Sequence, residues 1–347
     1  MQRPLLRIAC WLAVVGALAG CKNPIQIRTS GRIVADSPPQ NNISPVMPRQ
    51  VLNTGTDSGQ RVAVIDVDGL LLNMDMVGPS SHGENPVSLF REKLDAAATD
   101  PCVRAVVVRI NSPGGGVTAS DIMWHDLQAF KSRTNRPVVA CLLDVGSGGA
   151  YYLATAADVI VANPITITGG IGVILNLYDL TGAMAESQGR VYNLSIKAGE
   201  NIDLGSGMVP LPEEKRRLLQ EMANQMHRRF REIVIESRPL EDAADETNFD
   251  GRVFTAQQAL DRGLVDQIGY LDDAIAAAEA MAGIRGAHVV LYHRCNDPPR
   301  SLYAVTPNVP LQGGGLLPGM PGMDRSRLPT LLYLWQPEPT LEKLGGR

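Results

Sequence analysis

Apolar and polar positions follow one another in a regular order from residue 61 to residue 293. The β-branched run Val103–Ile110 predicts a buried strand, and Thr118–Ser132 repeats its apolar residues at helical spacing. Four of those residues share one helix face: Ala119, Met123, Leu127 and Phe130. A chain that alternates strands with amphipathic helices in this way is typical of a layered α/β domain.

The same pattern predicts the remaining elements of this domain. Further strands are expected at Arg61–Val67, Val138–Leu143, Asp158–Ala162, Val191–Ile196 and Val289–Tyr292. Further helices are expected at Val87–Ala97, Gly148–Ala157, Leu177–Gln188, Glu213–Glu236, Ala256–Arg262 and Leu271–Ala282. The apolar stripe of the long charged helix Glu213–Glu236 either covers the core of its own domain or contributes to assembly.

Residues 1–20 carry the pattern of a secretory signal peptide. Arg3 and Arg7 precede the apolar run Ile8–Ala19, which is too short and wrongly flanked for a membrane-spanning helix. The run ends in Leu18-Ala19-Gly20-Cys21, which resembles the bacterial lipobox, where the cysteine is lipidated and becomes the first residue. We therefore expect an exported lipoprotein, anchored through Cys21 to a membrane of a bacterial cell envelope, with plain cleavage as the alternative.

Two segments of biased composition flank the domain. Residues 21–60 are rich in Pro, Asn and Ser, which favours a tether between the lipid and the folded part. Residues 294–347 are dense in Pro and Gly and predict an irregular tail. The expected order is a signal peptide at 1–20, a lipid-anchored tether at 21–60, the domain at 61–293 and the tail at 294–347.

Charge, cysteines and histidines exclude several classes of function. The net charge of −4, without a stripe of Lys or Arg, gives no electrostatic case for nucleic-acid binding. On this reading Cys10 is removed and Cys21 is lipidated, so three cysteines remain, and an odd number implies no closed disulfide framework. The five histidines are too scattered for a Cys/His metal site, so neither a metal nor another cofactor is expected.

The run Asn111–Gly116 separates the strand Val103–Ile110 from the helix that follows it. Its Pro-Gly-Gly-Gly turn exposes backbone N–H groups, which can hold an oxyanion or a phosphate. Gly114, Gly116 and Ala119 fit the spacing of the dinucleotide fingerprint, but Asn-Ser-Pro separates the first glycine from the strand. No Lys-Ser/Thr pair follows the glycines, which excludes a phosphate-binding P-loop.

Four further segments stand in order along the chain: Asp144–Tyr152, Ala156–Pro164, Thr168–Val173 and Gly251–Thr255. Together with Asn111–Gly116 they resemble the short, single-domain form of the signal peptide peptidase A family of Ser–Lys serine peptidases. The resemblance extends from about residue 61 to residue 293. It implies an α/β fold of the Clp/crotonase type, built from repeated strand–strand–helix units, and a membrane-facing homo-oligomer that acts on peptides.

The resemblance also implies roles for individual positions. The family's nucleophile is the serine of an Ala-Ser-Gly-Gly-Tyr-Tyr motif, and its base is a lysine that a dry pocket keeps neutral. The Pro-Gly-Gly backbone stabilises the oxyanion, which implies that role here for Gly114 and Gly115. An alignment without gaps puts Gly148 at the nucleophile position, with Ser147 one residue early.

The lysine position differs from the family pattern in the same way. The family's Lys-Ser-Gly-x-x-Lys-Asp-Ile motif aligns with residues 197–204, so Lys197 matches the first lysine and Ile202 takes the place of the catalytic one. Two functions follow. A chain without a dyad is a peptide-binding, scaffold or regulatory subunit, alone or with a catalytic paralogue, and this is our expectation. A shifted register would instead give an active membrane-associated serine endopeptidase that degrades signal peptides or membrane-protein fragments, with Ser147 and Lys197 as the candidate catalytic residues.

Overall fold

The protein is described by a computed structural model that covers residues 27–29, 31–33, 44–52, 59–75, 84–186, 192–295, 299, 301–304 and 331–335. The chain divides into two compact units, Met1–Asn41 and Asn42–Arg347. In the described part of the first unit, β1 (Ile27–Thr29) and β2 (Gly31–Ile33) pair antiparallel. All other elements belong to the second unit.

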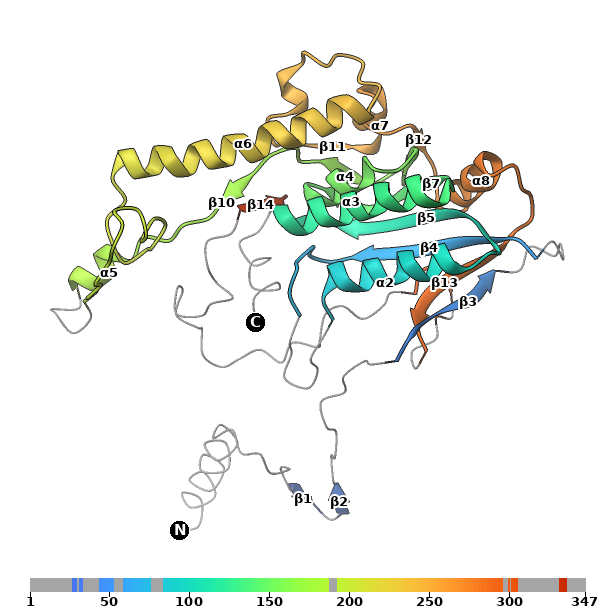
Figure 1. The fold of residues 1–347 in the computed structure, drawn as a ribbon, viewed down its shortest axis with the longest axis horizontal. Coiled ribbons are helices and arrows are strands. Elements are labelled where there is room, and N and C mark those ends of the chain that lie inside the picture. Colours follow the sequence, from blue (N-terminus) through green and yellow to red (C-terminus); the bar gives the residue numbers. More distant parts are fainter. Residues whose placement is uncertain are drawn as a thin grey trace, which may run out of the picture. The chain divides into compact units, whose positions relative to one another are not determined.

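Nine strands of the described chain form one large sheet whose centre is parallel (Figure 1). Their order is β11-β9-β7-β5-β4-β13-β3, and β8 pairs with β7 and with β12. The bounds are β3 Val46–Leu52, β4 Arg61–Asp68, β5 Val103–Ser112, β7 Val138–Ser147, β8 Val159–Ala162, β9 Ile167–Gly169, β11 Val253–Thr255, β12 Gln267–Ile268 and β13 His288–Arg294. The outer strands β3 and β11 run antiparallel to their neighbours, and the other pairs are parallel. This arrangement confirms the predicted α/β class.

Helices cover both faces of the sheet because its strands are apolar on both sides. Successive side chains of a strand point to opposite faces, so Ala63 and Ile65 of β4 enter one core while Val62 and Val64 enter the other. The first core is closed by α2 (Pro86–Thr99), α3 (Val117–Thr134), α4 (Gly149–Ala154) and α7 (Ala256–Asp261). The second is closed by α8 (Leu271–Met281).

A second sheet, with three strands, lies beside the first of these two cores. It has the order β10-β14-β6, with β10 at Ile174–Leu175, β14 at Leu331–Leu334 and β6 at Gly114–Gly116. The middle strand β14 comes from near the C-terminal end of the chain. This sheet therefore joins the predicted glycine run to a segment more than 200 residues away.

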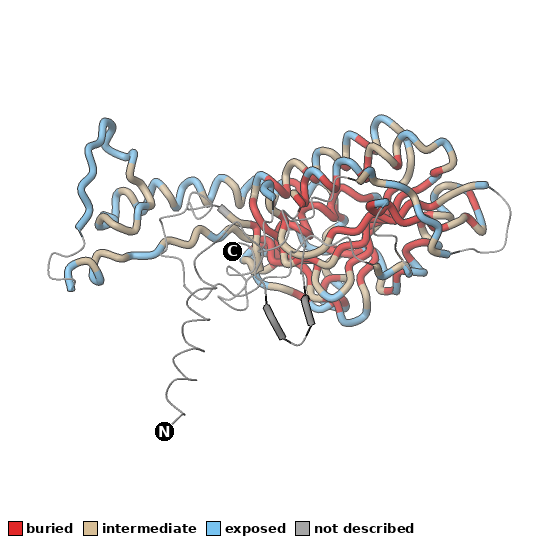
Figure 2. Tube along the Cα trace, turned by 90° about the horizontal axis from the view of Figure 1, so that it is seen from below, coloured by how far each residue is buried: buried red, intermediate tan, exposed pale blue. Residues whose placement is uncertain are grey.

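One part of the chain projects from the body, and we call residues 174–222 the arm. It contains α5 (Thr181–Glu186) and the first turns of α6 (Glu213–Ser237), and only Phe230, Ile233 and Val234 of α6 are buried. Figures 1 and 2 show the arm extending away from the sheet, and Figure 2 shows that its described residues are exposed or intermediate.

Two sequence predictions in the arm are wrong. A strand was expected at Val191–Ile196, but its described residues, 192–196, have no regular structure. The helix expected at Leu177–Gln188 is limited, within the described part of that range, to α5. An alternating apolar pattern predicts a half-buried strand only where another element covers its apolar face, and here Tyr192, Leu194 and Ile196 are exposed.

The folded unit includes segments outside residues 61–293. In the interval expected to be a tether, β3 pairs with β13 along the edge of the large sheet. In the interval expected to be a tail, the carbonyl oxygens of Leu302 and Ala304 accept hydrogen bonds from the buried Arg109 guanidinium. The predicted signal peptide and Cys21 lie outside the described residues. Within the described part, no helix combines the length and the apolar character needed to cross a membrane.

Candidate functional site

The glycine run after β5 is held against its neighbours at backbone distance. Gly114 has a φ of +104°, and a Cβ on Gly115 would lie 2.1 Å from the carbonyl oxygen of Leu71. Leu71 in turn exchanges backbone hydrogen bonds with Gly114 and Gly116, at 2.9 Å and 2.8 Å. Only glycine meets these demands of conformation and space. The amide of Gly114 donates to the Ser112 hydroxyl at 3.1 Å, so in this state that N–H group already has an acceptor.

The turn between β7 and α4 brings Ser147, Gly148 and Gly149 next to this run. Gly148 adopts φ +54° and ψ −125°, a backbone conformation that is strained for any residue with a side chain. Its amide donates to the carbonyl oxygen of Gly169 at 2.8 Å. The sharp reversal points position 148 toward β14. A Cβ on Gly148 would lie 2.5 Å from the carbonyl oxygen of Tyr333 in that strand.

The Ser147 side chain faces Pro113, at the start of the glycine run. It is fully buried, and its hydroxyl donates to the carbonyl oxygen of Pro113 at 3.4 Å, which is a long hydrogen bond. A Cβ on Gly170 would meet the Ser147 Cβ at 3.5 Å, so this side chain fills the space beneath the turn. Both residues of the turn are thus buried: Gly148 approaches Tyr333 of β14, and the Ser147 hydroxyl shares its acceptor with the amide of Trp335.

Two tyrosines fix the helix that follows the turn. The Tyr151 hydroxyl donates to the carbonyl oxygen of Leu264 at 2.7 Å, and burial raises the pKa of Tyr151. The Tyr152 hydroxyl donates to Asp121 at 2.5 Å, and its ring contacts Trp124 and Phe230 edge to face. Burial, with the nearby Asp121 carboxylate, raises the pKa of Tyr152. Tyr152 thus forms one wall of an aromatic pocket, while Tyr151 anchors α4 to the body.

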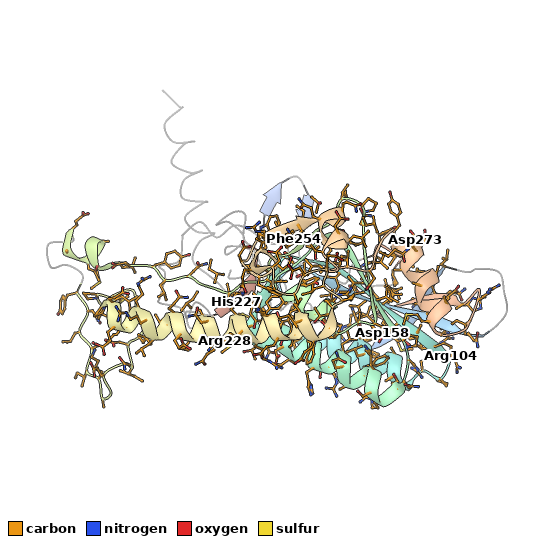
Figure 3. The ribbon with its side chains drawn as sticks, turned by 90° about the horizontal axis from the view of Figure 1, so that it is seen from above. Arg104, Asp158, His227, Arg228, Phe254 and Asp273 are labelled. Atoms are coloured by element: carbon orange, nitrogen blue, oxygen red, sulfur yellow. The ribbon has the colours of Figure 1, made fainter. Side chains whose placement is uncertain are left out.

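The side chain of His227 ties α6 to the same region. Its Nε2 atom lies 3.2 Å from the carbonyl oxygen of Ile171, two residues after the end of β9, the strand that pairs with Ser147. Figure 3 shows His227 on α6 at the point where that helix meets the body of the protein. His227 on α6 and the pairing of β10 with β14 therefore hold both chain ends of the arm near the body.

The structure places Lys197 and Ile202 at the far end of the arm rather than at the turn. Lys197 pairs with Asp203 at 2.5 Å, and Lys215 approaches the same carboxylate at 3.2 Å. The hydrogen bond from Lys197 and then that from Lys215 lower the pKa of Asp203 to about 2. Ile202 is 73% exposed. The segment that precedes α6 lies far from α4 in both Figure 1 and Figure 2.

Comparison with known proteins assigns the chain to a family. The model of peptidase family S49 matches residues 130–285, which include the turn at Gly148 and α4. The chain is 35% identical over 239 residues to the chloroplastic serine protease SPPA of Arabidopsis thaliana, which covers 66% of this chain and 33% of that protein. It is 28% identical over 288 residues to protease 4 of Salmonella typhi, which covers 83% of this chain and 43% of that protein.

This chain belongs to peptidase family S49. A third relative, a putative signal peptide peptidase SppA of Enterococcus faecium, is 28% identical over 235 residues, or 68% of this chain and 67% of that protein. The S49 chain thus spans less than half of the length of the first two relatives. Membership confirms the predicted signal peptide peptidase A resemblance and its fold. Among the described residues of this S49 chain, no group of three or more His, Cys, Asp and Glu is placed to hold a metal ion.

The prediction for this S49 site omitted one of its buried aromatic residues. Tyr333 of β14 is buried against Tyr152 and Phe230, although it lies in a segment expected to be an irregular tail. A signal was present, because Leu331-Leu-Tyr-Leu-Trp335 is an apolar and aromatic run within a Pro- and Gly-rich stretch. Such a run has the composition of a strand, but nothing in the sequence says which strands it joins.

Proposed function

We propose that this chain is a peptide-binding member of peptidase family S49 without peptidase activity of its own. One observation carries the proposal. The residue of the β7–α4 turn that points toward β14 is Gly148, which has no side chain to attack a peptide carbonyl, while the neighbouring Ser147 is fully buried. The position of the turn that faces β14 therefore carries no nucleophile.

The surroundings of Ser147 do not activate its hydroxyl. Its hydrogen-bond acceptor is the carbonyl oxygen of Pro113, and a carbonyl oxygen is far too weak a base to remove the proton. Lys197 lies on the arm, where its ammonium group pairs with Asp203 at 2.5 Å rather than with the Ser147 hydroxyl. A serine hydroxyl without a base is a poor nucleophile at neutral pH.

Peptide binding is supported by the two strand edges that flank β14. β6 and β10 are short, and each pairs with β14 from one side. Two such edges recognise the backbone of any extended chain placed between them, without any need for a nucleophile. Binding therefore survives the loss of catalysis, as a scaffold or regulatory subunit requires.

An active peptidase that uses Ser147 is the second candidate, and the names of the relatives favour it. The two candidates differ in their reaction with a fluorophosphonate probe. We expect the wild type to incorporate no more probe than Ser147→Ala, and to hydrolyse signal-peptide-like substrates at the rate of that variant. Labelling or cleavage by the wild type that Ser147→Ala abolishes would establish the active peptidase instead.

We further propose that the protein is exported and held at a bacterial envelope membrane by a lipid on Cys21. The proposal rests on the lipobox-like sequence Leu18–Cys21 at the end of an apolar leader. The Cys21→Ala variant should move from the membrane fraction to the soluble fraction, and intact mass of the membrane-bound wild type should show an acylated N-terminal cysteine. Cys295→Ala, at an exposed cysteine of the folded unit, is the matched control and should remain membrane-bound. An unmodified start at another residue would contradict the anchor.

A further inference from the structure

A short segment that follows β13 lies on the second core of the large sheet, and we call residues 301–304 the strap. The strap is a compact turn, in which the amide of Ala304 donates to the carbonyl oxygen of Ser301 at 3.1 Å. Leu302 and Ala304 pack against the second core, whereas Tyr303 between them is 57% exposed. Ordering four residues costs more conformational entropy than two partly buried side chains offset, so the strap also depends on polar contacts.

One buried guanidinium group supplies those polar contacts. Arg109 of β5 is 1% exposed, and its Nη1 group donates to the carbonyl oxygen of Leu302. Its Nη2 group donates to the carbonyl oxygen of Ala304 at 2.8 Å and to the carboxylate of Asp68, at the end of β4, at 3.3 Å. The strap and Asp68 therefore share one donor group, and the strap contributes to keeping water from both charged side chains.

The charged groups that act on Asp68 come from β4, β5 and α2. Asp66 lies two residues earlier on β4, and its carboxylate pairs with Lys93 of α2 at 2.6 Å, so these two charges offset each other. Beside Arg109 on the next strand, burial raises the pKa of the Cys141 thiol to about 12, so this thiol is neutral at physiological pH. Burial raises the pKa of Asp68 to about 6, although the charge of Arg109 opposes that shift. Asp68 is thus the group here that changes its charge between pH 5 and pH 7.5.

We propose that the strap is a pH-dependent switch, which stays closed on Arg109 while Asp68 is protonated and opens more often once Asp68 is ionised. The physical reason is hydration. In the closed form the carboxyl group is held away from water, and a low dielectric disfavours its ionised state. In the open form water solvates the carboxylate, and the guanidinium of Arg109 still attracts it. The closed form therefore binds the proton more tightly, and loss of that proton shifts the population toward the open form.

Opening of the strap removes Leu302 and Ala304 from the second core and uncovers the guanidinium of Arg109. The pH thereby controls how firmly the chain that follows β13 is attached to this face of the sheet. The size of the effect follows from the pKa of Asp68, which is about 6 in the closed form and returns to its ordinary value of 3.8 in the open form. The ratio of open to closed strap should then rise about tenfold from pH 5 to pH 7.5.

Hydrogen exchange of the full-length chain measures this ratio. The amides of Tyr303 and Ala304 are followed at pH 5 and pH 7.5, and each rate is divided by the intrinsic exchange rate at that pH. The corrected rate should be about tenfold higher at pH 7.5. At both pH values the strap amides should exchange faster than the α8 amides of Ala274 and Ala278, because the strap opens without global unfolding. A corrected rate that is the same at both pH values would overturn the proposal.

The variant Asp68→Asn shows whether this carboxyl group is responsible. Asparagine has nearly the same shape but cannot ionise, so the corrected rate of its strap should be the same at pH 5 and pH 7.5. Asp272→Asn, at an exposed carboxyl group of α8, which covers the same core, is the matched control and should keep the tenfold change. A tenfold change that persists in Asp68→Asn would assign the effect to another group and overturn the switch.

A second measurement covers the case in which Asp68→Asn does not fold. The titration of the Asp68 carboxyl group is followed by carbon-13 NMR in the wild type and in a variant with Leu302→Ser and Ala304→Gly, which removes both apolar contacts of the strap. The midpoint should lie near pH 6 in the wild type and fall toward 3.8 in the variant. Tyr303→Ser, at the exposed residue of the strap, is the control and should titrate as the wild type does. Equal midpoints in all three proteins would show that the strap does not control the hydration of Asp68, and would overturn the proposal.

Discussion

At the scale of single residues, position 148 fixes how closely β14 can approach the β7–α4 turn. Gly148 keeps the left-handed backbone that reverses the chain between β7 and α4. Its missing Cβ leaves room for the carbonyl group of Tyr333, whereas the adjacent Ser147 keeps its hydroxyl but lies buried. The chemistry available to this turn therefore depends on which of two neighbouring positions carries the serine.

Asp68, at the end of β4, makes the stability of the domain depend on pH. Burial raises the pKa of this carboxyl from 3.8 to about 6, although Arg109 lies 3.3 Å away. A folded-state pKa above the unfolded value means that the stabilisation by the protonated form is fully present below pH 3.8. It is lost as the pH rises through 6. The shift corresponds to a contribution of about 3 kcal/mol to the free energy of unfolding, and we expect about 1.4 kcal/mol of it to be lost between pH 5 and pH 7.5.

The measurement compares urea unfolding of the wild type and Asp68→Asn at those two pH values. The asparagine side chain cannot ionise. The free energy of unfolding of the variant minus that of the wild type should therefore increase by about 1.4 kcal/mol from pH 5 to pH 7.5. Other titrating groups are common to both proteins and cancel in this difference. A difference that is constant with pH, or that moves in the opposite direction, would show that Asp68 does not titrate in this range.

At the scale of elements, a buried ion pair joins α2 to the large sheet. Lys93 of α2 donates to Asp66 of β4 at 2.6 Å, and the two side chains are 1% and 0% exposed. Removing one partner leaves a charge buried without its counter-ion, which costs more than removing both. We expect Lys93→Ala to lower the free energy of unfolding by about 3–5 kcal/mol, and Asp66→Leu with Lys93→Met to lower it by less.

An exposed pair on the same helix provides the control. Arg91 is about half exposed and pairs with Asp95 at 2.8 Å and with Asp126 of α3 at 2.9 Å. Because solvent screens its exposed guanidinium, Arg91→Ala should lower the free energy of unfolding by less than about 1 kcal/mol in the same urea titration. Equal costs for Lys93→Ala and Arg91→Ala would show that the buried pair does not secure α2 against the sheet.

At the scale of the whole molecule, the arm exposes apolar side chains that a monomer leaves in water. They are Tyr178, Tyr192, Leu194, Ile196, Ile202, Leu211, Leu218 and Met222. Exposed apolar groups that gather in one projecting segment are typical of a contact surface. We therefore expect the arm to pack against another copy of the chain in a homo-oligomer, or against a catalytic paralogue in a mixed oligomer.

Multi-angle light scattering at micromolar concentration tests this assembly. The wild type should have the mass of an oligomer, and Leu194→Asp with Ile196→Asp should shift it toward the monomer, because charges would be buried at the contact. Ile165→Asp, at an apolar residue of the body that is 78% exposed, is the matched control and should leave the mass unchanged. A monomeric wild type throughout that concentration range would exclude self-assembly through the arm.

The sequence by itself determined the α/β class, the central strands and the covering helices, because their periodicity is local. The strand Val103–Ile110 and the helix Thr118–Ser132 are found within β5 and α3 with small shifts at their ends. The order of motifs likewise identified the family. That Gly148 and Ile202 occupy the two dyad positions stays a prediction.

Only the tertiary structure decided which segment pairs with β6. The run Leu331-Leu-Tyr-Leu-Trp335 is one of several apolar stretches, and its pairing with β6 is a contact between residues more than 200 positions apart. The alternating residues at Val191–Ile196 failed as a strand for the converse reason, since no element covers them in the described chain. Local pattern predicts which segments can form strands, whereas pairing depends on edges and pockets that exist only after the chain has folded.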